Sequence, residues 1–127
     1  MKYAALIILI ALVQYLFFTG QVGLMRGKLG VRAPQTSGHE TWERLFRVQQ
    51  NTMEQLVIFI PAMIAFSLYA SARWALLPGV LFVVGRQIYR YEYVKDPGSR
   101  TPGMALSLLS NVILLVGALI GLLMELI

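Results

Sequence analysis

The chain has 127 residues, enough for one domain, and we expect a single domain over residues 1–127. Hydrophobic residues make up 57% of the chain and charged residues 13%, with a mean hydropathy of +0.67. Soluble domains carry about 25% charged residues, so this composition predicts an integral membrane protein. The absence of cysteine excludes disulfides, thiolate metal sites and a protein thiol nucleophile. Six acidic residues and one histidine offer no cluster of metal ligands.

Four apolar segments are predicted to be membrane-spanning helices of an all-α, antiparallel four-helix bundle. They cover about residues 3–25, 40–71, 73–94 and 103–127, and polar turns separate the first from the second and the third from the fourth. The second and third follow each other almost without a loop, so they must be antiparallel. Pro61 is expected to kink the second helix.

Local signals near the helix ends add detail. Thr101 is predicted to cap the fourth helix, with Pro102 at the first helical position. Gly117 and Gly121 have the four-residue spacing of small side chains that suits close helix contact. His39 is expected to be an exposed loop residue without a role.

The net charge of +5 does not indicate nucleic acid as a partner, because the basic residues lie at the ends of apolar segments. Only Lys2 and Arg73 belong to the end that carries the termini. The other nine of the eleven Lys and Arg residues belong to the end with the first and third loops, namely Arg26, Lys28, Arg32, Arg44, Arg47, Arg86, Arg90, Lys95 and Arg100. The positive-inside rule therefore predicts cytoplasmic loops and outside termini, as in a bacterial inner membrane.

A polar stripe enters the membrane on the second helix. The apolar run of residues 56–70 would cover only about 22 Å as a helix, whereas a bilayer core needs about 30 Å. Arg47, Asn51 and Glu54 precede this run at positions i, i+4 and i+7, so they share one helix face. A carboxylate at membrane depth is costly and by default marks a functional site. Glu43 and Arg47 form an i,i+4 acid–base pair in the favourable orientation.

The third helix repeats this arrangement. Its apolar run, residues 74–85, is too short to span, which places Arg86, Tyr89 and Tyr93 at bilayer depth on one helix face. The second and third helices are joined by a turn near residue 72. Two residues, one from each helix, are therefore at the same depth when their numbers add up to about 143. Tyr89 then faces Glu54, and Arg86 is expected to reach Glu54.

The two stripes predict a pocket with several guanidinium groups, one carboxylate, an amide and phenols. Such a pocket suits a small zwitterion with excess negative charge, and a hydrophobic second substrate could enter from the lipid. Each residue alone has a structural explanation: Arg47 as a membrane anchor, Tyr89 as part of an aromatic belt, and Glu54 as half of an ion pair with Arg86. All of them being structural together is the less favoured interpretation.

Two motifs resemble a known family. The run from Trp42 to Glu54 resembles the signature of the MAPEG proteins, membrane-associated proteins in eicosanoid and glutathione metabolism. The pattern of Arg86, Tyr89, Tyr93 and Arg100 resembles the third helix and following loop of its glutathione-using members. The resemblance implies a homotrimer of four-helix subunits, with glutathione between adjacent subunits near the cytosolic face.

Carried over by position, the resemblance implies glutathione contacts at Arg47, Asn51, Glu54, Tyr89 and Tyr93. Arg26 and Gln49 would contribute to the site across the subunit interface, and Arg86 joins the contacts through its expected place beside Glu54. Arg100 would be the catalytic residue that activates the glutathione thiol. Several members have a tyrosine after the helix-two glutamate, whereas this chain has Gln55.

The function expected from these features is a glutathione S-transferase or peroxidase acting on hydrophobic electrophiles or lipid hydroperoxides. A thiol has an ordinary pKa of about 8.5, and a permanent cation beside it stabilises the thiolate. One alternative is a non-catalytic lipid-binding scaffold of the same family. Another is a small four-helix multidrug exporter, but such exporters carry a carboxylate in the first span and residues 3–25 contain none.

Overall fold

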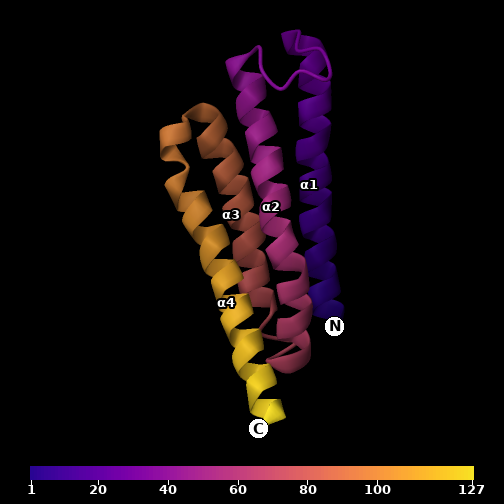
Figure 1. Ribbon diagram of the computed structural model, residues 1–127, viewed down its shortest axis with the longest axis vertical. Coiled ribbons are helices and arrows are strands. Elements are labelled where there is room, and N and C mark those ends of the chain that lie inside the picture. Colours follow the sequence, from indigo (N-terminus) through magenta and orange to yellow (C-terminus); the bar gives the residue numbers. More distant parts are fainter.

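The computed structural model describes all residues, 1–127, and consists of helices alone (Figure 1). The elements are α1 (Lys2–Leu29), α2 (Glu40–Tyr69), α3 (Leu76–Lys95), the single-turn 3-10 helix η1 (Pro97–Ser99) and α4 (Thr101–Leu126). The all-α antiparallel four-helix bundle is therefore confirmed.

The helices are arranged with α2 and α3 in the middle and α1 and α4 at the two edges (Figure 1). Both edge helices pack against α2 and α3. The two termini lie at one end of the bundle, and the connections from α1 to α2 and from α3 to α4 lie at the other (Figure 1). We call the latter the loop end, and it is the end that carries most of the basic residues.

Three segments are long and apolar enough to cross a membrane by length and composition: α1, α2 and the stretch Pro97–Leu126. The 20-residue α3, predicted as a fourth span, does not meet the same criterion, because its second half carries the polar stripe. It nevertheless lies alongside the others, packed against all three. The outward faces of α1 and α4 expose large apolar side chains, such as Val13 and Leu119, as lipid-facing surfaces do.

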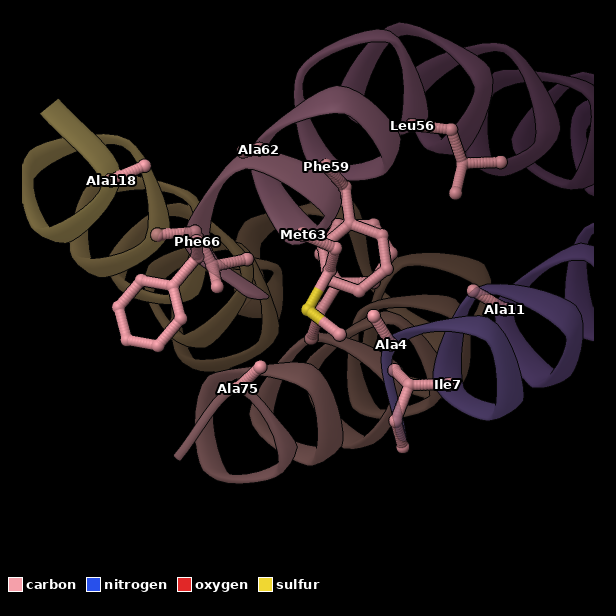
Figure 2. Packing of buried hydrophobic residues seen from close by; sticks show 12 residues of the cluster. Ala4, Ile7, Ala11, Leu56, Phe59, Ala62, Met63, Phe66, Ala75 and Ala118 are labelled. Atoms are coloured by element: carbon pink, nitrogen blue, oxygen red, sulfur yellow. The ribbon is translucent and has the colours of Figure 1, made fainter. Parts of the chain in front are cut away.

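A core of twelve buried apolar residues fills the end of the bundle near the turn between α2 and α3. Phe59 of α2 stacks on Phe82 of α3 with ring centroids 3.9 Å apart, and both are completely buried. Figure 2 shows Phe59 and Met63 turned toward α1, where small side chains such as Ala4 leave room for them. We call this cluster the apolar core. It consists of Ala4, Ile7, Ala11, Leu56, Phe59, Ala62, Met63, Phe66, Ala75, Phe82, Leu114 and Ala118.

Glycines allow α4 to approach its neighbours closely. A Cβ on Gly103 would overlap the backbone of Tyr89 and Gly85 in α3. A Cβ on Gly121 would overlap the carbonyl of Tyr69, and one on Gly117 would overlap the ring of Phe66. The close contact expected for Gly117 and Gly121 is therefore confirmed, and Gly103 is a further contact of the same kind.

Glutamines attach α1 to α3. The Gln14 carboxamide nitrogen donates to the Val83 carbonyl at 3.0 Å and to the Gln87 side chain at 3.2 Å. Two helical turns further along α1, the Gln21 side-chain oxygen accepts a hydrogen bond from Arg90 Nε at 3.0 Å. In apolar surroundings such contacts between helices have few competitors, so they fix the position of α1.

Several predicted helix ends are wrong by a few residues. Helix α1 continues to Leu29 and ends on Gly30, whose φ of 73° is one that glycine adopts without strain. Helix α2 runs through Pro61 and ends at Tyr69, and α3 begins at Leu76 after a turn of residues 70–75. That turn is longer than predicted and shifts the level of facing residues only slightly.

Two predictions for the starts of helices are also wrong, namely Thr101 as the cap of α4 and His39 as an exposed loop residue without a role. Helix α4 begins at Thr101 itself, and Arg100 occupies the capping position without a side-chain cap bond. His39 is half-buried and caps α2, because its Nδ1 accepts from the Thr41 backbone N–H at 3.2 Å.

Candidate functional site

Five of the predicted site residues line one cavity at the loop end. Arg47 and Asn51 come from α2, Tyr89 and Tyr93 from α3, and Arg100 precedes α4. Met104 of α4 completes the lining, and the cavity has a volume of about 260 Å³. We call it the α2–α3 cavity. Residues separated by more than fifty positions in the chain thus meet where three helices converge.

The tyrosines form one wall of this cavity. Tyr89 is buried, and its ring stacks on that of Tyr93 with centroids 5.4 Å apart. Tyr89 also packs against Phe18 of α1 and Val48 of α2. Because Gly103 has no side chain, α4 can lie directly against the Tyr89 backbone and bring Arg100 and Met104 to the same cavity.

Arg86 lies behind this wall, completely buried. Its Nη2 donates to Asn51 Oδ1 at 2.7 Å and to Thr52 Oγ1 at 3.1 Å. Its Cζ lies 4.3 Å from the centroid of the Tyr89 ring, within range of a cation–π interaction. Arg86 Nε and Nη1 have no hydrogen-bond partner. The guanidinium thereby fixes the Asn51 carboxamide that faces the cavity.

The predicted contact between Arg86 and Glu54 is not formed. Glu54 instead lies 3.8 Å from Arg47 Nη1, and both side chains are more than half exposed. Arg86 points between the helices to Asn51 and Thr52, whereas Glu54 lies on the outer face of α2. Glu54 does not line the α2–α3 cavity, so in the single chain it lies beside Arg47 at the rim of this cavity.

The predicted pair of Glu43 and Arg47 is also absent. The Glu43 side chain instead accepts a hydrogen bond from the backbone N–H of Gly38, which precedes α2, at 3.3 Å. The i,i+4 ion pair of this helix joins Glu40 and Arg44. Arg44 Nη1 in addition donates to the Val94 carbonyl at 3.0 Å, which ties the start of α2 to the last turn of α3.

Arg100 lies on a short ordered turn. The Asp96 side chain accepts from the Gly98 backbone N–H at 3.1 Å and so stabilises η1. Arg100 is exposed, and its Nη1 donates to the Pro97 carbonyl at 3.1 Å. The remaining donors of its guanidinium are free to meet a ligand in the cavity.

A second cavity of about 350 Å³ adjoins the first, between α2 and α4. We call it the α2–α4 cavity. Its polar lining includes Gln55, whose side-chain oxygen accepts from Asn111 Nδ2 at 3.0 Å. The two cavities share Asn51, Arg100 and Met104. The lining residues of the second cavity are Asn51, Gln55, Arg86, Arg100, Thr101, Met104, Ala105 and Leu108.

Two predicted residues lie elsewhere in the single chain. Arg26 donates from Nη1 to the Gln35 carbonyl at 2.8 Å, and its guanidinium lies over the Trp42 ring. Gln49 donates to Thr19 Oγ1 of α1 at 3.2 Å. Both therefore lie on the α1 side of α2, away from the two cavities.

Sequence reasoning missed Thr52 and Met104. Thr52 follows Asn51 directly and shares its bond to Arg86, but a threonine in an apolar helix carries no signal of its own. Met104 lies one turn after Arg100 and lines both cavities. Its position at i+4 from the predicted catalytic arginine was the signal available.

The fold and the cavities define an all-helical membrane bundle with a cation-rich site at one end. The family model described as the MAPEG family matches residues 3–120, and the chain belongs to this family.

Named relatives support the same assignment. An uncharacterized protein of Synechocystis is 41% identical over 122 residues, covering 96% of this chain and 89% of that protein. Microsomal glutathione S-transferase 2 of Bos taurus is 35% identical over 110 residues, covering 87% of this chain and 75% of the relative. The Homo sapiens protein of that name is 35% identical over 107 residues, with coverages of 84% and 73%. Together with the family, these relatives support a glutathione-related membrane function.

Proposed function

We propose that this protein is a membrane-bound glutathione S-transferase that directs the glutathione thiol at hydrophobic electrophiles. The observation that carries the proposal is the α2–α3 cavity, where Arg47, Asn51, Tyr89, Tyr93 and Arg100 meet. Relatives named microsomal glutathione S-transferase 2 support the choice of glutathione as co-substrate.

The chemistry of the cavity suits glutathione, a tripeptide with two carboxylates, one ammonium group and a thiol. Arg47 offers a fork of donors to a carboxylate. Glu54 lies 3.8 Å from Arg47 at the rim and can accept from the ammonium group. The Asn51 carboxamide and the tyrosine hydroxyls supply neutral hydrogen bonds. Arg86 acts here by holding Asn51 in place.

Arg100 is the proposed catalytic residue. A permanent cation beside a thiol favours the thiolate, and each unit by which the pKa falls corresponds to about 1.4 kcal/mol. Because the chain has no cysteine, the nucleophilic sulfur must come from the co-substrate. The thiolate would attack an electrophile, or a lipid hydroperoxide, that enters from the bilayer.

The proposal includes an assembly and an orientation. Arg26 and Gln49 face away from the cavities of their own chain, so we assign them to the glutathione site of a neighbouring subunit in a homotrimer. The basic loop end would face the cytoplasm of a bacterial inner membrane. A lipid-binding scaffold of the same family is less well supported, because it has no need of Arg100 at the cavity.

Calorimetric titration of the detergent-solubilised protein with glutathione tests binding, and conjugation of lipophilic electrophiles and hydroperoxides tests activity. We expect Arg100→Ala to change the dissociation constant by less than about threefold while lowering turnover about 100-fold. Arg73→Ala is the control, because Arg73 lies in the turn between α2 and α3 at the opposite end of the bundle. This variant should behave like the parent protein. Failure to bind glutathione would refute the proposed function and favour the scaffold. Unchanged turnover in Arg100→Ala would remove this residue from catalysis.

A further inference from the structure

The α2–α4 cavity has two chemically different sides. Asn51, Gln55 and Arg86 make one side polar, and Met104 and Leu108 of α4 make the other side apolar. It shares Arg100 with the α2–α3 cavity, as described above. A molecule bound in the α2–α4 cavity would therefore meet a thiolate held beside Arg100.

Arg86 lines this cavity, and its guanidinium forms no ion pair with a carboxylate. The ion pairs of the chain join Arg44 to Glu40 and Arg47 to Glu54, and neither involves Arg86. Its side chain is completely buried, and Nε and Nη1 form no hydrogen bond. A buried cation without a carboxylate is costly to the fold, so its presence calls for a purpose other than stability.

The guanidinium is also held in a fixed orientation. Asn51 and Thr52 both accept from Nη2, and the Tyr89 ring covers one face of the group. In these low-dielectric surroundings its charge acts on the cavity without needing contact with bulk water. A fixed cation of this kind stabilises negative charge that develops during a reaction.

We propose that the α2–α4 cavity binds electrophiles with a conjugated carbonyl group, and that Arg86 stabilises the negative charge that forms on the carbonyl oxygen. This inference rests on the proposed glutathione transferase function. The glutathione thiolate forms a bond to the β-carbon, and the π pair of the carbon–carbon double bond becomes a double bond between the α-carbon and the carbonyl carbon. The π pair of the carbonyl group moves to the oxygen, which gives an enolate. Water then protonates the α-carbon, and the hydroxide that remains takes up the proton released by the thiol, so that the net reaction is addition of the thiol across the double bond.

The inference predicts a preference between two kinds of substrate. An unsaturated ketone places the developing charge on oxygen near Arg86, whereas a benzyl halide of similar size places it on the departing halide. The measurement is the ratio of kcat/KM for these two substrates. We expect Arg86→Met to lower this ratio about 100-fold, because the fixed charge that stabilises the enolate oxygen is removed. Arg86→Lys, which keeps the charge, should recover at least about tenfold of the loss.

Arg90 provides a matched control on the same helix. It is half-buried one turn further along α3, but its Nε donates to Gln21 of α1 and it lines neither cavity. Arg90→Met should therefore leave the substrate ratio within about twofold of that of the parent protein. If Arg86→Met lowers kcat/KM for both substrates equally, so that their ratio is unchanged, Arg86 has no part in selecting the electrophile.

A second variant covers the case in which Arg86→Met fails to fold. Ala105 is exposed on α4 and lines the α2–α4 cavity, so Ala105→Phe fills the cavity without touching the packed interior. Calorimetry with a saturated ketone, in the absence of glutathione, should show binding to the parent protein and a loss of at least about tenfold in Ala105→Phe. Equal ketone binding by both would overturn the cavity assignment. A parent protein that binds the ketone but not glutathione would refute the proposed function alone.

Discussion

The two ends of the bundle use the same three helices in opposite ways. Near the turn between α2 and α3, Phe59 and Phe82 are stacked and fully buried, and side chains of α2 and α4 pack around them together with small and apolar residues of α1. At the loop end α2, α3 and α4 leave two adjoining cavities and a buried cation at Arg86, whose Nε and Nη1 have no hydrogen-bond partner. The difference teaches that the apolar core carries the stability of the bundle, and that the loop end is kept incomplete for a ligand.

The largest expected effect is on the apolar core. Phe59→Ala removes the stacked ring at the centre of the core and should lower the free energy of unfolding by about 3–5 kcal/mol. Chemical unfolding in detergent measures this, and titration with glutathione should show little change for the folded protein. Phe17→Ala, on the exposed face of α1, is the control and should cost much less. A small loss in Phe59→Ala would mean that the core does not dominate stability.

A smaller effect is expected where α4 meets α3. Gly103→Ala places a methyl group against the Tyr89 backbone, and overpacking of this kind costs about 1–3 kcal/mol. Because α4 must move, Arg100 and Met104 shift at the cavities, and glutathione should bind more weakly. Gly27→Ala is the control, since nothing lies within 4 Å of its added methyl group. If both variants have the same stability, the close approach of the two helices is not essential.

The third prediction reverses the pattern of the first. Glu54→Gln should raise the dissociation constant of glutathione about tenfold, because the amide keeps a hydrogen-bond acceptor but loses the negative charge that pairs with the ammonium group. The free energy of unfolding should change by less than about 1 kcal/mol, since the pair with Arg47 is more than half exposed. Calorimetry and unfolding in detergent give the two values, with Glu125→Gln at the C-terminus as the control. An unaltered dissociation constant would show that the carboxylate is structural.

The smallest effect is expected at the start of α2. His39→Ala removes the side-chain acceptor of the Thr41 N–H and should cost about 0.5 kcal/mol, at the low end for a helix cap. His39→Asn, which supplies another capping acceptor, should restore the parent stability in the same unfolding measurement. A loss of several kcal/mol would indicate that the loop end also contributes to the stability of the whole bundle.

The helices and the polar stripes were predictable because they depend on spacing along the chain. Apolar runs of given length predicted four helices, and positions i, i+4 and i+7 placed Arg47 and Asn51 on one face, where both line the α2–α3 cavity. The short apolar run of α3 correctly placed Tyr89 and Tyr93 beside them.

The partners of individual side chains were not predictable in the same way. Asn51 and Glu54 lie on one stripe of α2, and only the rotation of α2 against α3 decides which of them Arg86 meets. Spacing determines depth in the membrane but not that rotation, so the contact of Arg86 with Glu54 was wrongly expected. The close approach of α4 to α3 at Gly103 was not predicted either, because it depends on the relative position of two backbones and no sequence motif indicates it.

The glutamines that join α1 to α3 have a consequence for how the protein is made. Helix α1 is long and apolar enough to cross a membrane by itself, and a few directional bonds of Gln14 and Gln21 join it to α3. We therefore expect insertion and docking to be separable events, so that residues 1–38 and 39–127, produced as two polypeptides in one membrane, associate into the complete bundle.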